Sequence, residues 1–125
     1  WFMRTLEQVI IDTLSEFKIE GSRKRDYPGV WVLDDKICAM GVRISRWVTM
    51  HGFALNVSTD LSYFGRIIPC GMPNLAVTSV QAEMGTPIST DDCAEIIASM
   101  LAEKLNRELS WADLADFELS VPDLT

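Results

Sequence analysis

The sequence lacks any apolar run approaching the roughly 18 residues that a membrane-spanning helix requires. Stretches such as 30–33 and 67–69 are far shorter. Histidine occurs once, and the three cysteines, Cys38, Cys70 and Cys93, form no Cys-x-x-Cys pair. A disulfide scaffold and a zinc ribbon are therefore excluded. These absences predict a soluble protein without a bound metal, in a reducing compartment, either the cytoplasm, which we take as the expectation, or an organelle matrix.

Basic residues are scarce as well, and the charge is unevenly spread. The net charge is −7, with nine Lys and Arg against eight Asp and Glu in residues 1–66, and two against ten in residues 67–125. Nucleic-acid-binding proteins gather basic residues around aromatic side chains. The one basic cluster here is the run 23–25. We therefore expect neither a nucleic acid nor a membrane among the partners.

The length and composition are those of a single globular domain. The chain has 125 residues, 48% of them hydrophobic, which is enough for one core and too little for two comfortable domains. Because the sequence opens with Trp1 rather than methionine, we expect it to belong to a longer protein.

Hydrophobic spacing predicts two helices. The first carries an apolar stripe behind a capping box formed by Thr5 and Gln8. Its stripe consists of Leu6, Val9, Ile10, Leu14 and Phe17. The second helix begins at Ser89 or Thr90 and runs to about Glu108.

The segment between the helices has the pattern of a sheet. Residues 18–26 are polar and are expected to form a loop that ends in a turn at Pro28-Gly29. Apolar runs separated by tight turns then predict a hairpin and a further strand. The expected strands are 30–33, 36–44 and 53–57, with a turn at Asp34-Asp35. We expect an α/β (α+β) fold, in which a mixed sheet is flanked by helices.

Three side chains in this sheet region could carry chemistry. Cys70 lies in a Pro-Cys-Gly bend, which can expose a thiol at a sheet edge, although most free cysteines are small core residues. Lys36 is either a solvated turn lysine or an amine beside a thiol, where it would stabilise the thiolate or take its proton. His51 is a weaker candidate, because a lone histidine at the start of a strand is more often an ordinary polar residue than a catalyst or ligand. Cys38 and Cys93 fall at positions that the core would claim.

Three linked motifs resemble the octanoyltransferase family of lipoate biosynthesis. They are KICAMGVRI at 36–44, HGFALNV at 51–57 and Pro69-Cys70-Gly71. Their order and spacing both match, and the similarity runs over residues 4–80.

The resemblance implies transfer of an octanoyl group from octanoyl acyl carrier protein to a lysine of a lipoyl domain, without a cofactor. The acceptors would be lipoyl domains of 2-oxoacid dehydrogenases and the glycine cleavage H protein. By the family pattern, Cys70 would be the nucleophile that carries the acyl thioester. Lys36 would lower its pKa or act as general base. The residues matching the family's acyl pocket are Ala39, Met40, Gly41, Gly52, Phe53 and Ala54. The implied fold is that of the biotin and lipoate protein ligases.

One family signature has no counterpart here. The family carries an Arg-Gly-Gly segment followed by His-Gly-Pro-Gly-Gln, whereas the His-Gly of this sequence, at 51–52, is followed by Phe53. We therefore expect residues 1–125 to form a single domain that is the C-terminal portion of one octanoyltransferase catalytic domain, with an incomplete substrate site. Two alternatives stay open. One is an ATP-dependent lipoate or biotin-type ligase that contacts an adenylate through Lys36 and leaves Cys70 idle; the other is a non-catalytic fragment.

The charge pattern also suggests where a donor protein would dock. Acyl carrier proteins are acidic, so the basic residues of the first half are predicted to include the docking surface. These residues are Arg23, Lys24, Arg25, Arg43 and Arg46. The alternative is an ordinary solvated loop.

Overall fold

The computed structural model describes residues 1–66 and 74–116 of the chain, apart from the side chain of Leu114. In chain order, its elements are α1 (Phe2–Glu16), β1 (Ser22–Lys24), β2 (Tyr27–Val32), β3 (Asp35–Ser45), β4 (Val48–Leu55), the short 3-10 helix η1 (Leu61–Arg66), α2 (Val80–Met84), α3 (Thr90–Leu105) and the 3-10 turn η3 (Leu114–Asp116).

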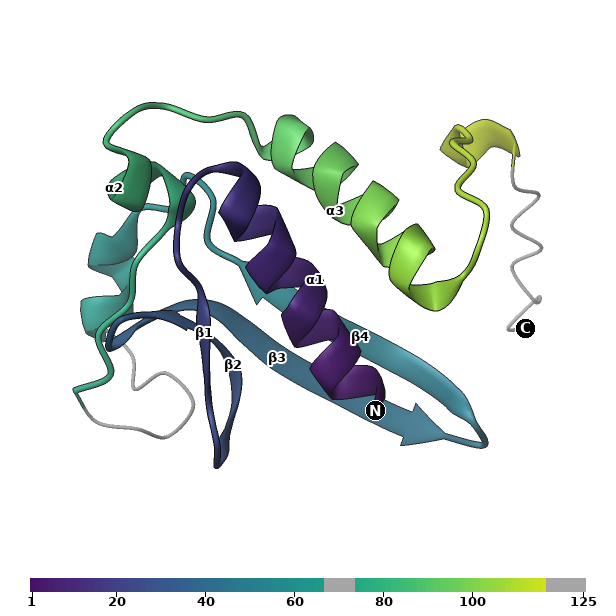
Figure 1. Ribbon diagram of the computed structural model, residues 1–125, viewed down its shortest axis with the longest axis horizontal. Helices are drawn as coiled ribbons and strands as arrows, with labels where there is room; N and C mark the ends of the chain where they lie inside the picture. The colour runs from purple at the N-terminus through teal and green to yellow at the C-terminus, as the bar shows by residue number, and fades with distance from the viewer. Residues whose placement is uncertain (67–73, 117–125) are drawn as a thin grey trace, which may run out of the picture.

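The four strands form one sheet covered by helices. Their order is β1-β2-β3-β4, and each neighbouring pair is antiparallel. Within the described residues, a parallel pairing occurs at the isolated bridge between Lys36 and Val77. Helix α1 lies across the sheet and α3 runs beside α1, while the β3–β4 hairpin extends past the helices at one end (Figure 1). The expected α+β class with flanking helices is confirmed.

The core lies between α1 and the sheet. The apolar stripe of α1 presents Ile10 and Leu14 to Val30, Ile37 and Cys38 of the sheet, and all five are fully buried. Full burial of an aliphatic side chain stabilises a fold by about 1.5–3 kcal/mol. This cluster therefore fixes the start of β3 firmly beneath α1.

A β-bulge interrupts the pairing of β2 with β3. Val30 pairs with Cys38, but the next residue of β2, Trp31, pairs with Lys36, so Ile37 is an extra residue on β3. Paired residues share a face of a sheet, and consecutive residues of one strand alternate between faces. Cys38 therefore lies on the core face with Val30, and Lys36 lies on the opposite face with Trp31.

Helix α1 begins earlier than the predicted capping box, which was wrong. The helix starts at Phe2, and the hydroxyl of Thr5 donates to the carbonyl of Trp1 at 3.2 Å from within the helix. Helix α3 begins as expected, because the Ser89 hydroxyl accepts hydrogen bonds from the backbone at its N-terminus, including that of Asp91 at 3.1 Å.

The polar segment expected as a loop contains an edge strand. Ser22–Lys24 pairs with β2 through Ser22 and Trp31, and Lys24 and Tyr27. An edge strand needs only one row of backbone partners and tolerates charged side chains, so its polar sequence gave no strand signal.

Candidate active site

Lys36 is the second residue of β3, and its backbone has a neighbouring segment on each side. Trp31 pairs with it across the sheet, and on the other side its N–H donates to Ala76 O at 2.9 Å while its carbonyl accepts from Thr78 N–H at 3.0 Å. The residue is only 6% exposed. The ammonium nitrogen lies 5.0 Å from the centroid of the Trp31 ring, a cation–π distance. The structure thus excludes the solvated turn lysine.

Gly29 makes room for this lysine. It is buried, with a φ of +140°, and a Cβ built there would lie 2.7 Å from the Cys38 carbonyl oxygen and 2.8 Å from Lys36 Cε. The alkyl chain of Lys36 therefore passes directly against the Gly29 backbone. The turn predicted at Pro28-Gly29 was wrong, because both residues lie within β2, and the role of Gly29 as a wall of the site was not predicted.

Beside Lys36 the structure contains an apolar cavity of about 160 Å³. It is lined by Lys36, Ile37, Cys38, Ala39, Ala54, Asn56, Phe64, Leu75 and Val77. Phe64 precedes the segment 67–73 and Leu75 follows it, so the chain borders this cavity on both sides of that segment. The predicted nucleophile Cys70, with Pro69 and Gly71, lies outside the described residues.

The six predicted acyl-pocket residues face one another across β3 and β4. Ala39 pairs with Ala54, Met40 with Phe53, and Gly41 with Gly52. Together with His51 they line an open hollow that shares Ala39 and Ala54 with the cavity beside Lys36.

The two faces of this paired segment differ. Met40 and Phe53 pack against the core, so by strand alternation the four small residues lie on the opposite face, which is also the face of Lys36. A Cβ at Gly41 or Gly52 would meet nothing within 4 Å. The segment thus has a smooth, shallow surface leading away from Lys36.

The two described cysteines are poor nucleophiles. Cys38 is fully buried, and burial raises the pKa of its thiol to about 12 even though the positive charge of Lys36 acts in the opposite direction. Burial also raises the pKa of Cys93, which is 1% exposed, and the Asp92 carboxylate adds to this effect. A thiol attacks as its thiolate, so both cysteines fit the core role expected from the sequence.

His51 is exposed and lies on β4 opposite Val42, with a φ of +66°. It borders the hollow rather than the cavity beside Lys36. Within residues 1–66 and 74–116 no three His, Cys, Asp or Glu side chains are grouped so as to hold a metal ion. In that same part of the chain, no helix is both long enough and apolar enough to cross a membrane.

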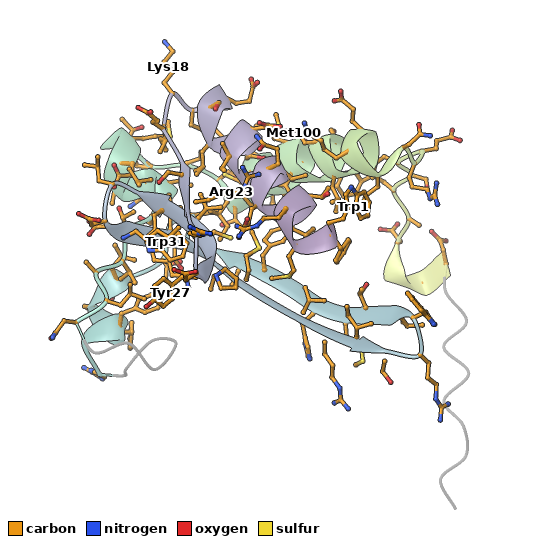
Figure 2. All side chains as sticks on the ribbon, turned by 60° about the horizontal axis from the view of Figure 1, so that its bottom comes forward. Trp1, Lys18, Arg23, Tyr27, Trp31 and Met100 are labelled. Atoms are coloured by element: carbon orange, nitrogen blue, oxygen red, sulfur yellow. The ribbon has the colours of Figure 1, made fainter. Side chains whose placement is uncertain are left out.

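The predicted docking residues are not equivalent. Arg23 lies beside α1 (Figure 2). Its guanidinium is bound to Glu7 at 3.1 Å and to Gln8 at 2.7 Å, and Lys24 pairs with Asp34 at 3.1 Å. Arg43 and Arg46 are exposed near the end of the β3–β4 hairpin. Arg23 and Lys24 thus have intramolecular partners, whereas the hairpin end exposes basic and apolar side chains together, including Trp47 at 99% exposure.

Comparison with known proteins gives a consistent family. The model of the lipoyl protein ligase A/B catalytic domain matches residues 1–102. The chain is 45% identical to the octanoyltransferase of Gloeobacter violaceus over 102 residues, covering 82% of this chain and 45% of that protein. It is 55% identical to the octanoyltransferase of Solibacter usitatus over 94 residues, covering 75% of this chain and 42% of that protein.

A solved structure shares the fold. Lipoate-protein ligase A bound with ATP superimposes with a TM-score of 0.71 at 14% identity, covering 88% of this chain and 47% of that one. The expected ligase-type fold is therefore confirmed. The chain spans about half the length of the curated relatives it matches.

Proposed function

Because this chain belongs to the lipoyl protein ligase A/B catalytic domain family, we propose that it forms the C-terminal portion of an octanoyltransferase. The proposed enzyme moves an octanoyl group from octanoyl acyl carrier protein to a lysine of a lipoyl domain. The observation that carries the proposal is the buried amine of Lys36 at an apolar cavity, which the chain borders on both sides of the segment containing Cys70.

The reaction proceeds in two balanced steps. The Cys70 thiolate attacks the thioester carbonyl of the donor; a carbon–sulfur bond forms to Cys70, the bond to the donor sulfur breaks, and the donor thiol leaves with a proton. The acceptor lysine amine then attacks the Cys70 thioester, giving an amide and restoring the cysteine. A thioester exchanges for a thioester and then for a more stable amide, so ATP is not required.

Lys36 supports both steps through its charge and its proton. An unperturbed thiol has a pKa of about 8.5 and is mostly protonated at neutral pH. An ammonium group beside the thiol favours the thiolate, and can pass a proton to the departing sulfur. The clamped backbone of Lys36 and the wall formed by Gly29 hold that amine in one place.

The octanoyl chain would lie along the small-residue face of β3 and β4. Ala39, Gly41, Gly52 and Ala54 leave an open surface there that begins at the cavity beside Lys36. Burying a methylene group stabilises binding by about 0.8 kcal/mol, so a chain of this length supplies enough binding energy for selection. The other wall would come from the upstream half of the protein.

Arg23 and Lys24 have internal partners, whereas Arg25, Arg43 and Arg46 are exposed. Of these three, Arg43 and Arg46 lie near each other at the end of the β3–β4 hairpin and form the part of the proposed donor-docking surface to test first. Reversing both charges in a double Arg43→Glu, Arg46→Glu variant should raise the KM for octanoyl acyl carrier protein, most strongly at low salt. Lys18→Glu, a single reversal two residues beyond the end of α1, is the control against which Arg43→Glu and Arg46→Glu are each compared singly. An unchanged KM at every ionic strength would remove this surface from the proposal.

The central experiment follows the acyl group by mass spectrometry. The 125-residue chain, and the chain joined to its upstream half, are each incubated with octanoyl acyl carrier protein without ATP. We expect an octanoyl adduct on Cys70 in the joined protein, absent in Cys70→Ser, slowed in Lys36→Ala and unaffected in Cys93→Ser.

The other outcomes separate the alternatives. An adduct only in the joined protein means that the isolated chain has an incomplete pocket. Acceptor modification that needs ATP and free octanoate, and that survives Cys70→Ser, would establish a ligase instead. If neither condition yields a product in the joined protein, it is non-catalytic and the proposal fails.

A further inference from the structure

We propose that Glu7 is a positioning residue for Lys36, acting through the backbone of Gly29. The inference rests on the proposed role of Lys36, but its geometry is independent of any substrate. Glu7 lies on α1, and a hydrogen bond followed by a single van der Waals contact leads from its carboxylate to the lysine side chain.

Glu7 is a buried carboxylate with both oxygens engaged. It is 1% exposed. Its Oε2 accepts from Arg4 Nη1 at 2.7 Å and from Arg23 Nε at 3.1 Å, and its Oε1 accepts from the N–H of Gly29 at 3.1 Å. Figure 2 shows Arg23 beside α1, where this group lies. The carboxylate thus ties the first turns of α1 to both β1 and the start of β2.

Gly29 transmits this attachment to the lysine. Its backbone lies so close to Lys36 that a Cβ would come within 2.8 Å of Cε. The hydrogen bond from Gly29 to Glu7 fixes where that backbone stands, and so fixes one wall against which the Lys36 alkyl chain rests. The Trp31 ring, 5.0 Å from the ammonium, flanks the same side chain.

The ion pairs of Glu7 with Arg4 and Arg23 engage only one of its two oxygens. Burying a carboxylate is unfavourable unless it is paired and hydrogen-bonded, and the neighbouring buried positions of α1, such as Val9 and Ile10, are apolar. The other oxygen of Glu7 accepts a hydrogen bond from the backbone N–H of Gly29. Gly29 belongs to β2 and contacts the Lys36 side chain. Positioning of that wall explains why an acceptor stands at this place.

The test measures the chemical accessibility of the Lys36 amine, which needs no acyl substrate. The joined protein is acetylated with limiting acetic anhydride, and the labelling of Lys36 is compared by peptide mass spectrometry with that of Lys18. Lys18 is exposed and extends away from the molecule (Figure 2), so it serves as an internal reference. The variants are Glu7→Ala, which removes the acceptor, and Glu7→Gln, which keeps an amide oxygen for Gly29 but loses the charge.

Two control variants separate positioning from general stability. Val80→Ala destabilises the same core from another element, and Arg4→Ala removes one ion pair of Glu7 without touching the Gly29 hydrogen bond. Unfolding midpoints in urea are recorded for every variant, so that labelling through global unfolding can be subtracted.

We expect Glu7→Ala to raise the Lys36:Lys18 labelling ratio by about tenfold, because local opening exposes the amine. Glu7→Gln should restore most of the protection, while Val80→Ala and Arg4→Ala leave the ratio near that of the parent. In the acyl-transfer assay Glu7→Ala should lower kcat by about 10–100-fold with little change in KM, again with rescue by Gln.

Three results would overturn the inference. They are an unchanged labelling ratio in Glu7→Ala, an equal rise in Val80→Ala at matched stability, and a Gln variant as exposed as the Ala variant, which would assign Glu7 to charge pairing with the arginines. If labelling behaves as expected while no variant or parent forms an octanoyl adduct, the positioning of Lys36 stands and the proposed function is what fails.

Discussion

Replacing Gly29 by alanine is the sharpest single test of how the site is built. The residue has a φ of +140°, a region in which a side chain costs about 1–3 kcal/mol. The added methyl would also lie 2.7 Å from the carbonyl oxygen of Cys38 and 2.8 Å from Lys36 Cε. Overpacking a closed site costs about 1–3 kcal/mol more, so we expect a loss of about 2–6 kcal/mol of the 5–15 kcal/mol typical of a domain.

The two groups that the added methyl would meet differ in how easily they can move. Lys36 Cε is near the end of a flexible side chain and can move, whereas the Cys38 carbonyl belongs to β3 and is held beneath the core. We therefore expect Gly29→Ala both to destabilise the fold and to displace the Lys36 amine. Gly41→Ala is the matched control, because a Cβ at Gly41 meets nothing within 4 Å, and its unfolding free energy should stay within about 1 kcal/mol of the parent.

The assay is urea unfolding followed by the fluorescence of the tryptophans, which include the buried Trp31. Gly29→Ala should move the midpoint to clearly lower urea at an unchanged slope, and Gly41→Ala should hardly move it. If Gly29→Ala lay within about 0.5 kcal/mol of the parent, or if the two variants were equally destabilised, the wall assigned to Gly29 would be refuted.

Other predictions concern titration and helix ends. Because burial raises the pKa of Cys38 from 9.0 to about 12, its thiol should resist iodoacetamide at pH 8 in the native protein, and labelling as fast as in urea would contradict this. The contribution of the buried thiol to stability should be intact below pH 9.0 and should decline as the pH rises toward 12. Burial opposes the lowered pKa of Asp12, but hydrogen bonds from Gln8 and Lys104 outweigh it. Asp12→Asn should therefore cost less than about 1 kcal/mol in urea unfolding at neutral pH, a difference that is lost as the pH falls below 3.8, whereas a cost that persisted in acid would argue against the pair. Asn106 ends α3 with a φ of +52°, so Asn106→Ala should lower the thermal midpoint through a cost of about 1 kcal/mol and Asn106→Gly should not; equal midpoints would refute the helix-end argument.

Helix α3 was predictable because its start is encoded locally. The Ser89 hydroxyl accepts hydrogen bonds from N–H groups two and three residues further along the chain. Such a short-range interaction can be predicted from neighbouring residues in the sequence. The start of α1 was not predicted correctly, because the Thr5 hydroxyl donates a hydrogen bond to the carbonyl of Trp1 from within the helix and does not cap its N-terminus. The edge strand 22–24 was hidden for a different reason, because what makes it a strand is its pairing with β2 rather than its own composition.

The site residues also differ in how far their positions could be predicted from the sequence. The family motifs drew attention to Gly41 and Gly52, but their pairing across β3 and β4 was not predicted, because the expected strand began after Gly52. The burial of Lys36 depends on partners distant in the chain: the segment 76–78, which holds its backbone, and Glu7, which holds Gly29. No local pattern around a lysine that follows two aspartates encodes those contacts, so the sequence favoured a solvated side chain until the family resemblance was considered.

The bulge at Ile37 decides which cysteine can take part in the proposed chemistry. Simple alternation would put Lys36 and Cys38, two residues apart, on one face of β3, and the lysine would then activate the neighbouring thiol. The extra residue instead sends the Lys36 side chain to the face of Trp31 and leaves Cys38 fully buried on the core face with Val30, although both residues border the cavity. Burial there raises the pKa of Cys38 so far that even a nearby ammonium does not offset it. In the proposed reaction, the thiol that uses Lys36 is therefore not that of Cys38. The chain between Phe64 and Leu75, which both line that cavity, is the segment that contains Cys70.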